Sequence, residues 1–246
     1  MERGLYIAAS GMLAEQVRQD QIANDLANAS TPGYKADRSA QASFADLLLS
    51  NSQTGEQVGS LSMGARIARV VTDLSQGPLQ QTGDPLDLAL QGDGFLAVST
   101  PAGTRYTRDG QLALDDQGRL VTVTGYVVLG TDGRPITAAG LRTPDDLQVS
   151  QAGVVSVRGR TVGTIDVASL TGAAKEGDTL FTGTAGPRPT ATTIAQGYLE
   201  GSGVEPARAM VDMIVSLRAY ESSQRVLHAI DDTLGRATQS VGSATG

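Results

Sequence analysis

The fold of this chain is decided near its N-terminus, by the stretch LYIAASGMLAEQVRQDQIANDLANASTPGYK, residues 5–35. Residues at alternating spacings of four and three share one side of this stretch, which is the pattern of a helix seam. In order they are Leu5, Ala9, Met12, Gln16, Gln19, Ala23 and Leu26. Pro32 and Gly33 then end the helix, because proline disfavours helical backbone just before it and glycine suits a turn. The stretch predicts a long helix over residues 5–28.

A second amphipathic helix is expected at the other end of the chain, over residues 206–241. Pro206 is tolerated at its start, because the N–H that proline lacks would be unpaired at a first helical position. The apolar residues of this helix follow two heptad phases, one in its first part and another in its second part. The two parts can therefore contact different neighbours. The first phase holds Met210, Ile214 and Leu217, and the second holds Tyr220, Leu227, Ile230, Leu234, Ala237 and Val241.

Between the two helices the hydrophobic period falls to two. From about residue 65, short apolar runs alternate with glycine and Asp-Gly turns every eight to twelve residues. This spacing is typical of an antiparallel β domain. Strands are expected at 86–90, 95–98, 104–107, 112–114, 120–123, 126–129, 147–149, 154–157 and 162–170. Residues 36–64 are polar and lack a clear period, so they are expected to be loop or linker.

The predicted fold class is therefore α+β. Long N- and C-terminal helices form a coiled-coil-like core region and flank a mostly antiparallel β insert. The expected division is a helical domain of residues 1–35 and 204–246, a linker over 36–64, and a β-rich domain over 65–203.

Composition excludes several functions. The 246 residues carry a formal net charge of −7, which argues against nucleic acid as a partner. No cysteine is present, so neither a disulfide nor a thiolate metal site can form. No run of about 18 or more apolar residues occurs, so membrane insertion is not expected. The N-terminus also lacks the pattern of a cleaved signal peptide, and any export must use another route.

Catalytic chemistry is not predicted either. The single histidine, His228, has no partner for a triad or a metal cage. The pairs Asp115-Asp116 and Asp145-Asp146 lie where aspartate is the usual turn residue. Gly92-Asp93-Gly94 lacks the third glycine of a dinucleotide fingerprint. The sequence therefore indicates no enzyme, no cofactor, and no catalytic or metal residues.

Several blocks together resemble bacterial flagellar axial proteins, the family of rod, hook and hook-associated proteins. The N-terminal block is IANDLANASTPGYK, residues 22–35, with LDLALQGDGF at 86–95, YTRDG at 106–110 and GYLEGSGV at 197–204. The signature residues of the first block are Asn24, Leu26, Ala27, Asn28, Thr31, Gly33 and Tyr34. The chain departs from the family at Asp25, where a second asparagine is frequent, and at Gly203 and Glu205, where asparagine is common.

This resemblance implies a structural subunit of the basal-body rod, which crosses the periplasmic space and transmits torque from motor to hook. The terminal helices would pack into an inner tube and the β domain would form an outer layer. The implied partners are copies of itself, other rod and hook axial proteins, and the flagellar type III export gate. The expected assembly interface comprises Leu5, Ala9, Met12, Leu26, Met210, Ile214, Leu217, Tyr220, Leu227 and Leu234. Phe44 and Leu48 resemble an export motif.

The type of rod protein is the finer question. The short middle region and the ending at residues 231–237 resemble the proximal-rod type, which is favoured. Residues 218–221 and the opening at 3–8 are closer to the distal-rod type, which is the alternative. Two alternatives from other classes are a monomeric β-rich binding module and a peptidoglycan hydrolase.

Overall fold

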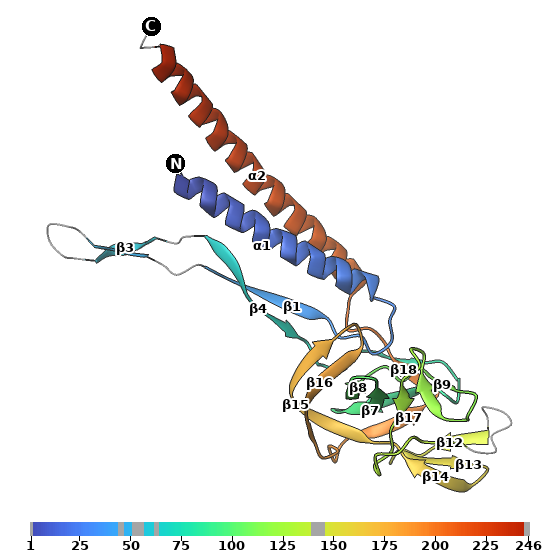
Figure 1. Cartoon of the computed structure of the whole chain (residues 1–246). Helices are drawn as coiled ribbons and strands as arrows, with labels where there is room; N and C mark the ends of the chain where they lie inside the picture. Colours follow the sequence, from blue (N-terminus) through green and yellow to red (C-terminus); the bar gives the residue numbers. More distant parts are fainter. Residues whose placement is uncertain (1, 44–46, 51–56, 62–63, 139–145, 244–246) are drawn as a thin grey trace. The chain divides into compact units, whose positions relative to one another are not determined.

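The computed structural model describes residues 2–43, 47–50, 57–61, 64–138 and 146–243. The chain forms two compact units (Figure 1). The first, here called the helical unit, comprises residues 1–27, 37–71 and 206–246. The second, here called the β unit, comprises residues 28–36 and 72–205. Each unit therefore draws on segments that are distant in the sequence.

The helical unit is built on two long helices, α1 (Glu2–Ala27) and α2 (Pro206–Ser243). The two helices run antiparallel: Glu15 of α1 contacts Ser216 of α2, while Gly4 near the start of α1 lies beside Ile230 farther along α2. Both predicted helices are confirmed, including the start of α2 at Pro206. The predicted fold class, with packed terminal helices and an antiparallel β region, is confirmed as well.

A β ribbon completes the helical unit. Strand β1 (Asp37–Ser43) pairs with β4 (Ala65–Thr72), and β2 (Leu47–Ser50) pairs antiparallel with β3 (Gln57–Leu61). The expectation of a loop over residues 36–64 is thus wrong for these segments. The sequence of β1, DRSAQAS, lacks the alternation that signals a half-buried strand, but backbone pairing with β4 supplies the hydrogen bonds that define a strand. The wider division into inner-tube domain, linker and outer domain stays a prediction about the assembled state.

The β unit holds the remaining strands. A seven-stranded sheet has the order β15-β16-β8-β7-β11-β10-β9, and smaller sheets have the orders β12-β13-β14, β17-β6 and β18-β5. The strands are β5 (Leu79–Gln81), β6 (Leu88–Gln91), β7 (Phe95–Thr100), β8 (Gly103–Thr107), β9 (Leu112–Leu114), β10 (Leu120–Thr122), β11 (Val127–Val128), β12 (Leu147–Val149), β13 (Val154–Val157), β14 (Arg160–Thr164), β15 (Val167–Glu176), β16 (Leu180–Gly186), β17 (Thr193–Gln196) and β18 (Tyr198–Glu200).

Most predicted strands of the β unit are present, with two differences. The single strand expected over 162–170 is divided into β14 and β15 by Ile165 and Asp166, whose backbone N–H groups donate to Gly153 and Leu129. Strands β5, β16, β17 and β18 were not predicted. They are short or, like β16, rich in glycine, so that alternation is weak within them.

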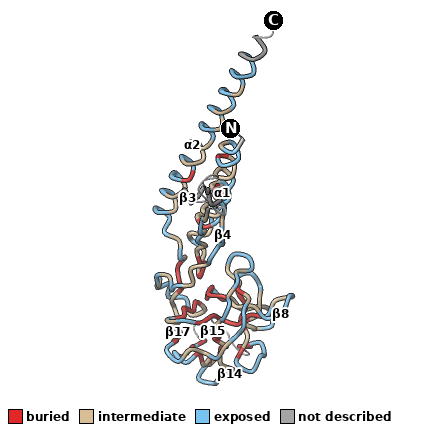
Figure 2. The backbone as a smooth tube through the Cα atoms, turned by 90° about the vertical axis from the view of Figure 1, so that its left-hand side faces the viewer, coloured by how far each residue is buried: buried red, intermediate tan, exposed pale blue. Residues whose placement is uncertain are grey.

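The hydrophobic core lies within the β unit. Val98, Val128, Val155 and Ile165 are completely buried there and pack in one cluster with the leucines of β6 and β7. Figure 2 shows buried residues concentrated in this unit, whereas the two helices are mostly exposed or half-buried. The β unit thus covers its own apolar surface, and the helices do not.

Candidate assembly interface

Small residues of α1 line its contact with α2. A Cβ added at Gly4 would lie 3.2 Å from Cδ1 of Ile230, and one added at Gly11 would lie 3.7 Å from Oγ of Ser223. Between them Ala8 is buried. Glycine and alanine at these positions let the two helix backbones approach closely.

A polar contact fixes the register of the two helices. The Ser216 hydroxyl is fully buried and lies 2.6 Å from Oε2 of Glu15, to which it donates. Gln41 of β1 donates its side-chain amide to Oε1 of the same carboxylate over 3.1 Å. Glu15 therefore joins α1, α2 and the ribbon. The heptad pattern gave no sign of this role, because Glu15 lies outside the predicted seam.

The two heptad phases of α2 occupy two different faces of the helix. Tyr220, Leu227 and Leu234 share the phase of Ser216 and are half-buried. Met210, Ile214 and Leu217 belong to the other phase and are 50%, 51% and 47% exposed. The change from one heptad phase to the other near Tyr220 is therefore a change of helix face. One face of α2 packs on α1, and the other carries apolar side chains into solvent.

The predicted seam of α1 is adjacent to the face that contacts α2. The contacts with α2 come from Gly4, Gly11 and Glu15, so the intrachain seam lies one residue before the predicted positions. Of the predicted set, Leu5 is 39% exposed, and Ala9, Met12 and Leu26 are half-buried. Whether these side chains meet a neighbouring subunit stays a prediction.

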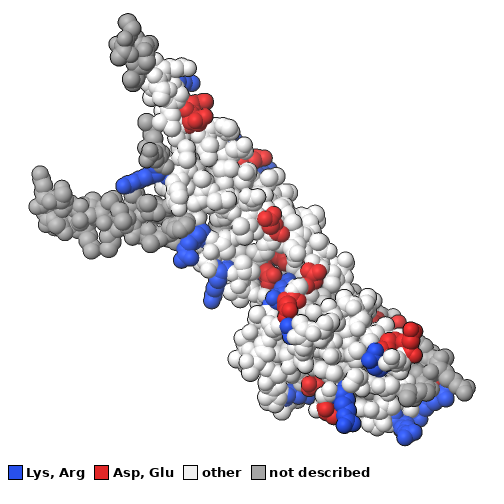
Figure 3. Space-filling view, in the orientation of Figure 1, with Lys and Arg blue, Asp and Glu red and all other residues white. Residues whose placement is uncertain are grey.

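Apolar side chains are also exposed on the rest of the helical unit. On α1 they include Tyr6, Leu13 and Val17, and on β4 they include Val70 and Val71. Figure 3 shows that the visible surface of the long helices is mostly uncharged, with scattered acidic and basic side chains. Many exposed apolar side chains on one unit indicate a site of protein association.

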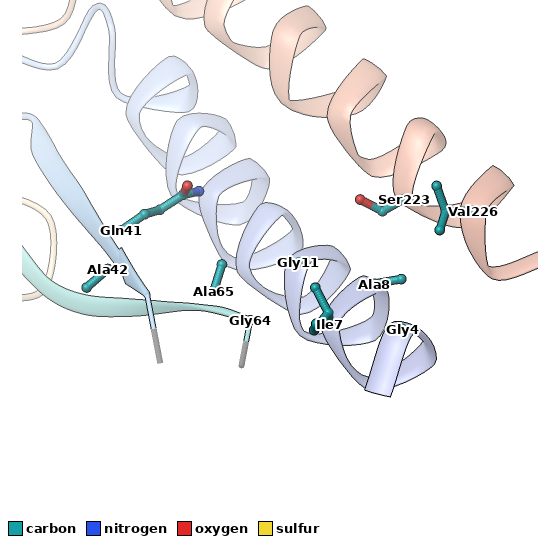
Figure 4. Close-up of a pocket in the computed structure, with 10 residues that line it drawn as sticks. All are labelled: Gly4, Ile7, Ala8, Gly11, Gln41, Ala42, Gly64, Ala65, Ser223 and Val226. Carbon is teal, nitrogen blue, oxygen red and sulfur yellow. The ribbon is translucent and has the colours of Figure 1, made fainter. Parts of the chain in front are cut away.

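Two of the cavities in the described part of the chain lie beside α1. The larger, of about 730 Å³, lies between α1, the ribbon and α2; Figure 4 shows Gly4, Ile7, Ala8 and Gly11 along its α1 side and Ser223 and Val226 on α2. The smaller, of about 310 Å³, has an almost wholly apolar lining that α1 and β4 provide. The helical unit is therefore incompletely packed on both sides of α1.

In the β unit, the sequence blocks that carry the family resemblance meet at one buried ionic junction. The carboxylate of Glu200 accepts hydrogen bonds from the Lys35 ammonium group, from the Arg108 guanidinium group over 3.1 Å, and from the backbone N–H of Gly77 over 2.8 Å. Side chains of all three charged residues are at most 2% exposed. Burial lowers the pKa of Lys35, while the adjacent carboxylate of Glu200 opposes that shift.

Glycines make this junction possible. Gly33 has a φ of 67°, and a Cβ there would lie 2.4 Å from the carbonyl carbon of Arg108. The N–H of Gly33 donates to the carbonyl of Glu200 over 2.8 Å, and that of Gly203 donates to the carbonyl of Tyr34 over 2.8 Å. The segment that follows α1 and the segment that precedes α2 are therefore tied together within the β unit.

The signature residues divide between the two units. Asn24, Leu26 and Ala27 lie in the last turn of α1, whereas Asn28, Thr31, Gly33 and Tyr34 belong to the β unit. The Thr31 hydroxyl donates to the side-chain oxygen of Asn28 over 3.1 Å, and Tyr34 is completely buried beneath Lys175, whose Nζ lies 3.8 Å from the ring centroid. The motif thus serves backbone geometry and packing, which explains its glycine and its aromatic residue.

The suggested export motif lies largely outside the described residues. Phe44 is not described, and Leu48 is described only as part of the backbone of β2. Among the described residues, neither long helix has the run of apolar character that a membrane span requires.

Comparison with known proteins gives three family matches. Residues 5–35 match the family described as "Flagella basal body rod protein", residues 89–157 match "Flagellar hook protein FlgE/F/G D1 domain", and residues 195–240 match "Flagellar basal body rod FlgEFG protein C-terminal". The first and last of these cover the segments that contain most of α1 and α2.

Similar proteins match over almost their full lengths. The flagellar basal-body rod protein FlgG of Borreliella burgdorferi is 35% identical over 269 aligned positions, covering 96% of this chain and 98% of the relative. The rod protein FlgF of Caulobacter vibrioides is 34% identical over 237 positions, covering 92% and 93%. The flagellar hook-basal body complex protein FlhO of Bacillus subtilis is 30% identical over 273 positions, covering 98% and 99%.

Proposed function

This chain belongs to the flagellar basal-body rod protein family, and from that premise we propose that it is a rod subunit of the proximal type. In this proposal it assembles through its terminal helices with copies of itself and with other rod and hook axial proteins. The assembled rod transmits torque from the motor to the hook. The family is structural, and the chain is not an enzyme.

One observation supports the mode of assembly most directly. The β unit buries its apolar residues in its own core, whereas Met210, Ile214 and Leu217 of α2 remain about half exposed. Burial of apolar surface contributes about 25 cal/mol per Å². Packing these helices against one another in a tube would therefore provide stabilisation that the free subunit lacks. Neighbouring subunits would supply the missing packing.

The length of the chain supports the proximal type. The alignment with the Borreliella FlgG protein runs over more positions than the 246 residues of this chain, so that relative carries additional residues. The alignment with the Caulobacter FlgF protein runs over only 237 positions. The short middle region of this chain, which resembles the proximal-rod type, supports the proximal position, and the distal position is the second candidate.

The experiment that tests this proposal is a cryo-EM map of isolated basal bodies from the native organism. We expect density for this chain in the rod segment nearest the motor, with α1 and α2 in the inner wall. Density in the segment nearest the hook would assign the distal type instead. Absence of the chain from the rod would refute the proposed function.

The proposed route of export is the flagellar type III gate, with Phe44 and Leu48 as the contacting residues. Exchanging either for alanine should lower the ratio of secreted to cytoplasmic protein in a strain that cannot build a rod. Val123→Ala is a suitable control, because Val123 is 64% exposed in the β unit and has no proposed role in export. Unchanged secretion of both Phe44→Ala and Leu48→Ala would remove these residues from the export route.

A further inference from the structure

We propose that the groove between α1 and β4 receives the exposed face of α2 from a second copy of this chain, in an antiparallel orientation and with an Arg66–Glu221 ion pair at one end. The groove is the smaller cavity, walled by Tyr6, Leu13 and Val17 of α1 and by Ala65, Arg66 and Ile67 of β4. The inserted face, here called the α2 stripe, comprises Met210, Ile214, Leu217 and Glu221. This inference rests on the proposed function and specifies its partner surface.

The stripe and the groove are both available in the free chain. At 3.6 residues per turn, the α2 stripe lies roughly 100–160° around α2 from Ser216, which faces α1. Tyr6, Leu13 and Val17 lie on roughly the opposite side of α1 from Glu15, which contacts Ser216. The contact between α1 and α2 of one chain therefore covers neither surface. Tyr6, Leu13 and Val17 are accordingly 55%, 64% and 49% exposed.

The spacings of the two surfaces match. Along α1 the groove side follows Tyr6, Ser10, Leu13 and Val17, in steps of four, three and four. Along α2 the stripe follows Met210, Ile214, Leu217 and Glu221 in the same steps. Equal heptad spacing lets the side chains of one helix enter the spaces between those of the other.

The chemistry of the matched positions selects the antiparallel orientation. In this orientation Val17 meets Met210, Leu13 meets Ile214, and Tyr6 meets Glu221. In the parallel orientation Val17 would meet Glu221, which would bury a carboxylate against an apolar side chain without a partner. Such burial is strongly unfavourable. The antiparallel orientation is also the one that α1 and α2 adopt within the chain.

Charge complementarity identifies the occupant as a second copy. Arg66 lines the groove and is the second residue of β4, two residues after Gly64. Gly64 lies near Ile7 and Ser10, which places Arg66 at the Tyr6 end of the groove. Among the residues that the structure describes, neither Arg66 nor Glu221 forms an ion pair, and both are exposed. Arg225, one turn after Glu221, instead donates its Nε to the Glu221 carbonyl. Antiparallel docking brings the free cation and the free anion together.

Because the groove and the stripe are different surfaces of one chain, their contact is head-to-tail. Repeating such a contact produces an open helical assembly unless its rotation happens to close a ring. The free chain therefore carries both halves of a contact that can extend a tube.

The test is charge reversal in a strain that lacks the native gene, read out by swimming and by the amount of this chain in isolated basal bodies. Arg66→Glu and Glu221→Arg each place like charges in the contact, and each should lower incorporation by about tenfold or more. Producing both variants in the same cell should restore incorporation, because each groove then meets a stripe of opposite charge. The double variant Arg66→Glu/Glu221→Arg should restore it as well.

Arg69→Glu is the matched control, because Arg69 is exposed on the same strand but does not line the groove. It should leave incorporation unchanged. Normal incorporation of either single variant, or no rescue on mixing, would overturn the inference and indicate another occupant. If the wild-type gene itself fails to place the chain in the rod, the proposed function fails, which is a separate outcome.

Discussion

The helical unit and the β unit differ in how completely they bury their apolar and charged side chains. In the β unit, even the charged side chains of Lys35, Arg108 and Glu200 are enclosed, and both cations contact the Glu200 carboxylate. In the helical unit, Ile214 and Leu13 are apolar and more than half exposed. This difference indicates that the β unit is stable as a free subunit, whereas the helical unit reaches its full packing only among neighbours. Variants in each unit can test that comparison, here in order of decreasing effect on the free energy of unfolding.

The largest effect is expected for Glu200→Gln. Removing this carboxylate leaves Lys35 and Arg108 buried without an anion, and breaking a buried ion pair in this way costs about 3–5 kcal/mol. Urea unfolding followed by circular dichroism measures the change, since the chain has no tryptophan. Glu176→Gln is the control: Glu176 pairs with Arg105 but is 49% exposed, and such pairs contribute about 0–1 kcal/mol. Equal losses for both variants would contradict the role of the junction.

The next effect is expected for Gly33→Ala. A side chain at a φ of 67° costs about 1–3 kcal/mol, and here the added Cβ also collides with the backbone of Arg108. Gly83→Ala isolates the collision, because Gly83 has a φ of 77° but no atom lies within 4 Å of an added Cβ. The difference between the melting temperatures of Gly33→Ala and Gly83→Ala then measures the destabilisation caused by the collision with the backbone of Arg108. Equal melting temperatures would show that the backbone relaxes at Gly33 without loss.

A smaller, pH-dependent effect is expected for Asp109→Asn. Burial, with a further contribution from the nearby Asp87 carboxylate, raises the pKa of Asp109 above its ordinary value of 3.8. A raised pKa in the folded state means that folding holds the proton more tightly, so stability declines as pH rises from about 4 through the raised pKa. Asparagine removes this decline and can still accept the hydrogen bond from Gln111.

Urea unfolding of Asp109→Asn and of the unchanged chain at pH 4 and pH 7 measures this effect. Between pH 4 and pH 7 the variant should gain stability relative to the unchanged chain, because it lacks the carboxyl group whose charged form is disfavoured by burial. Burial also raises the pKa of Asp166. This residue is present in both proteins, so its contribution to the pH dependence of stability cancels in the comparison. A variant that loses stability at pH 7 would indicate that the Asp109 charge is needed.

The smallest effect on the free subunit is expected for Ile214→Asp, although its effect on assembly should be complete. Ile214 is exposed, and surface substitutions usually change stability by less than about 0.5 kcal/mol. In a packed tube the same aspartate would be buried without a partner, so rods and motility should be lost. Val123→Asp, on the exposed surface of the β unit, should leave both rod formation and motility unchanged. Normal rods with Ile214→Asp would place this face of α2 outside the assembly contact.

The sequence predicts the long helices and most strands because their signals are local. Heptad spacing marks α1, Pro206 marks the start of α2, and Asp-Gly turns separate the strands. The ribbon at β1 escaped prediction because its stability comes from pairing with β4, more than 20 residues away, rather than from its own composition.

The candidate interface was predicted in composition but not in geometry. The sequence identified two phases of apolar residues on α2, but only the structure shows that the face of Leu227 packs on α1 whereas Ile214 is exposed. Nor could spacing predict the role of Glu15, because its partners Ser216 and Gln41 come from other elements. The family resemblance correctly indicated the rod family, whereas the pairing of Lys35 with Glu200 depends on the folded arrangement of residues from both ends of the β unit.

The junction at Glu200 also constrains the order in which the β unit can fold. Lys35 and Glu200 are separated by 165 positions, and β18 at the end of the unit pairs with β5 near its start. Contacts of such high contact order form late, because a long loop must be closed before any of them is made. If the chain emerges from one end to the other, the β unit cannot close until its last segment arrives, whichever end leads. Its topology therefore delays closure of the whole unit until nearly the whole sequence has been delivered, even though neighbouring strands such as β7 and β8 can pair earlier.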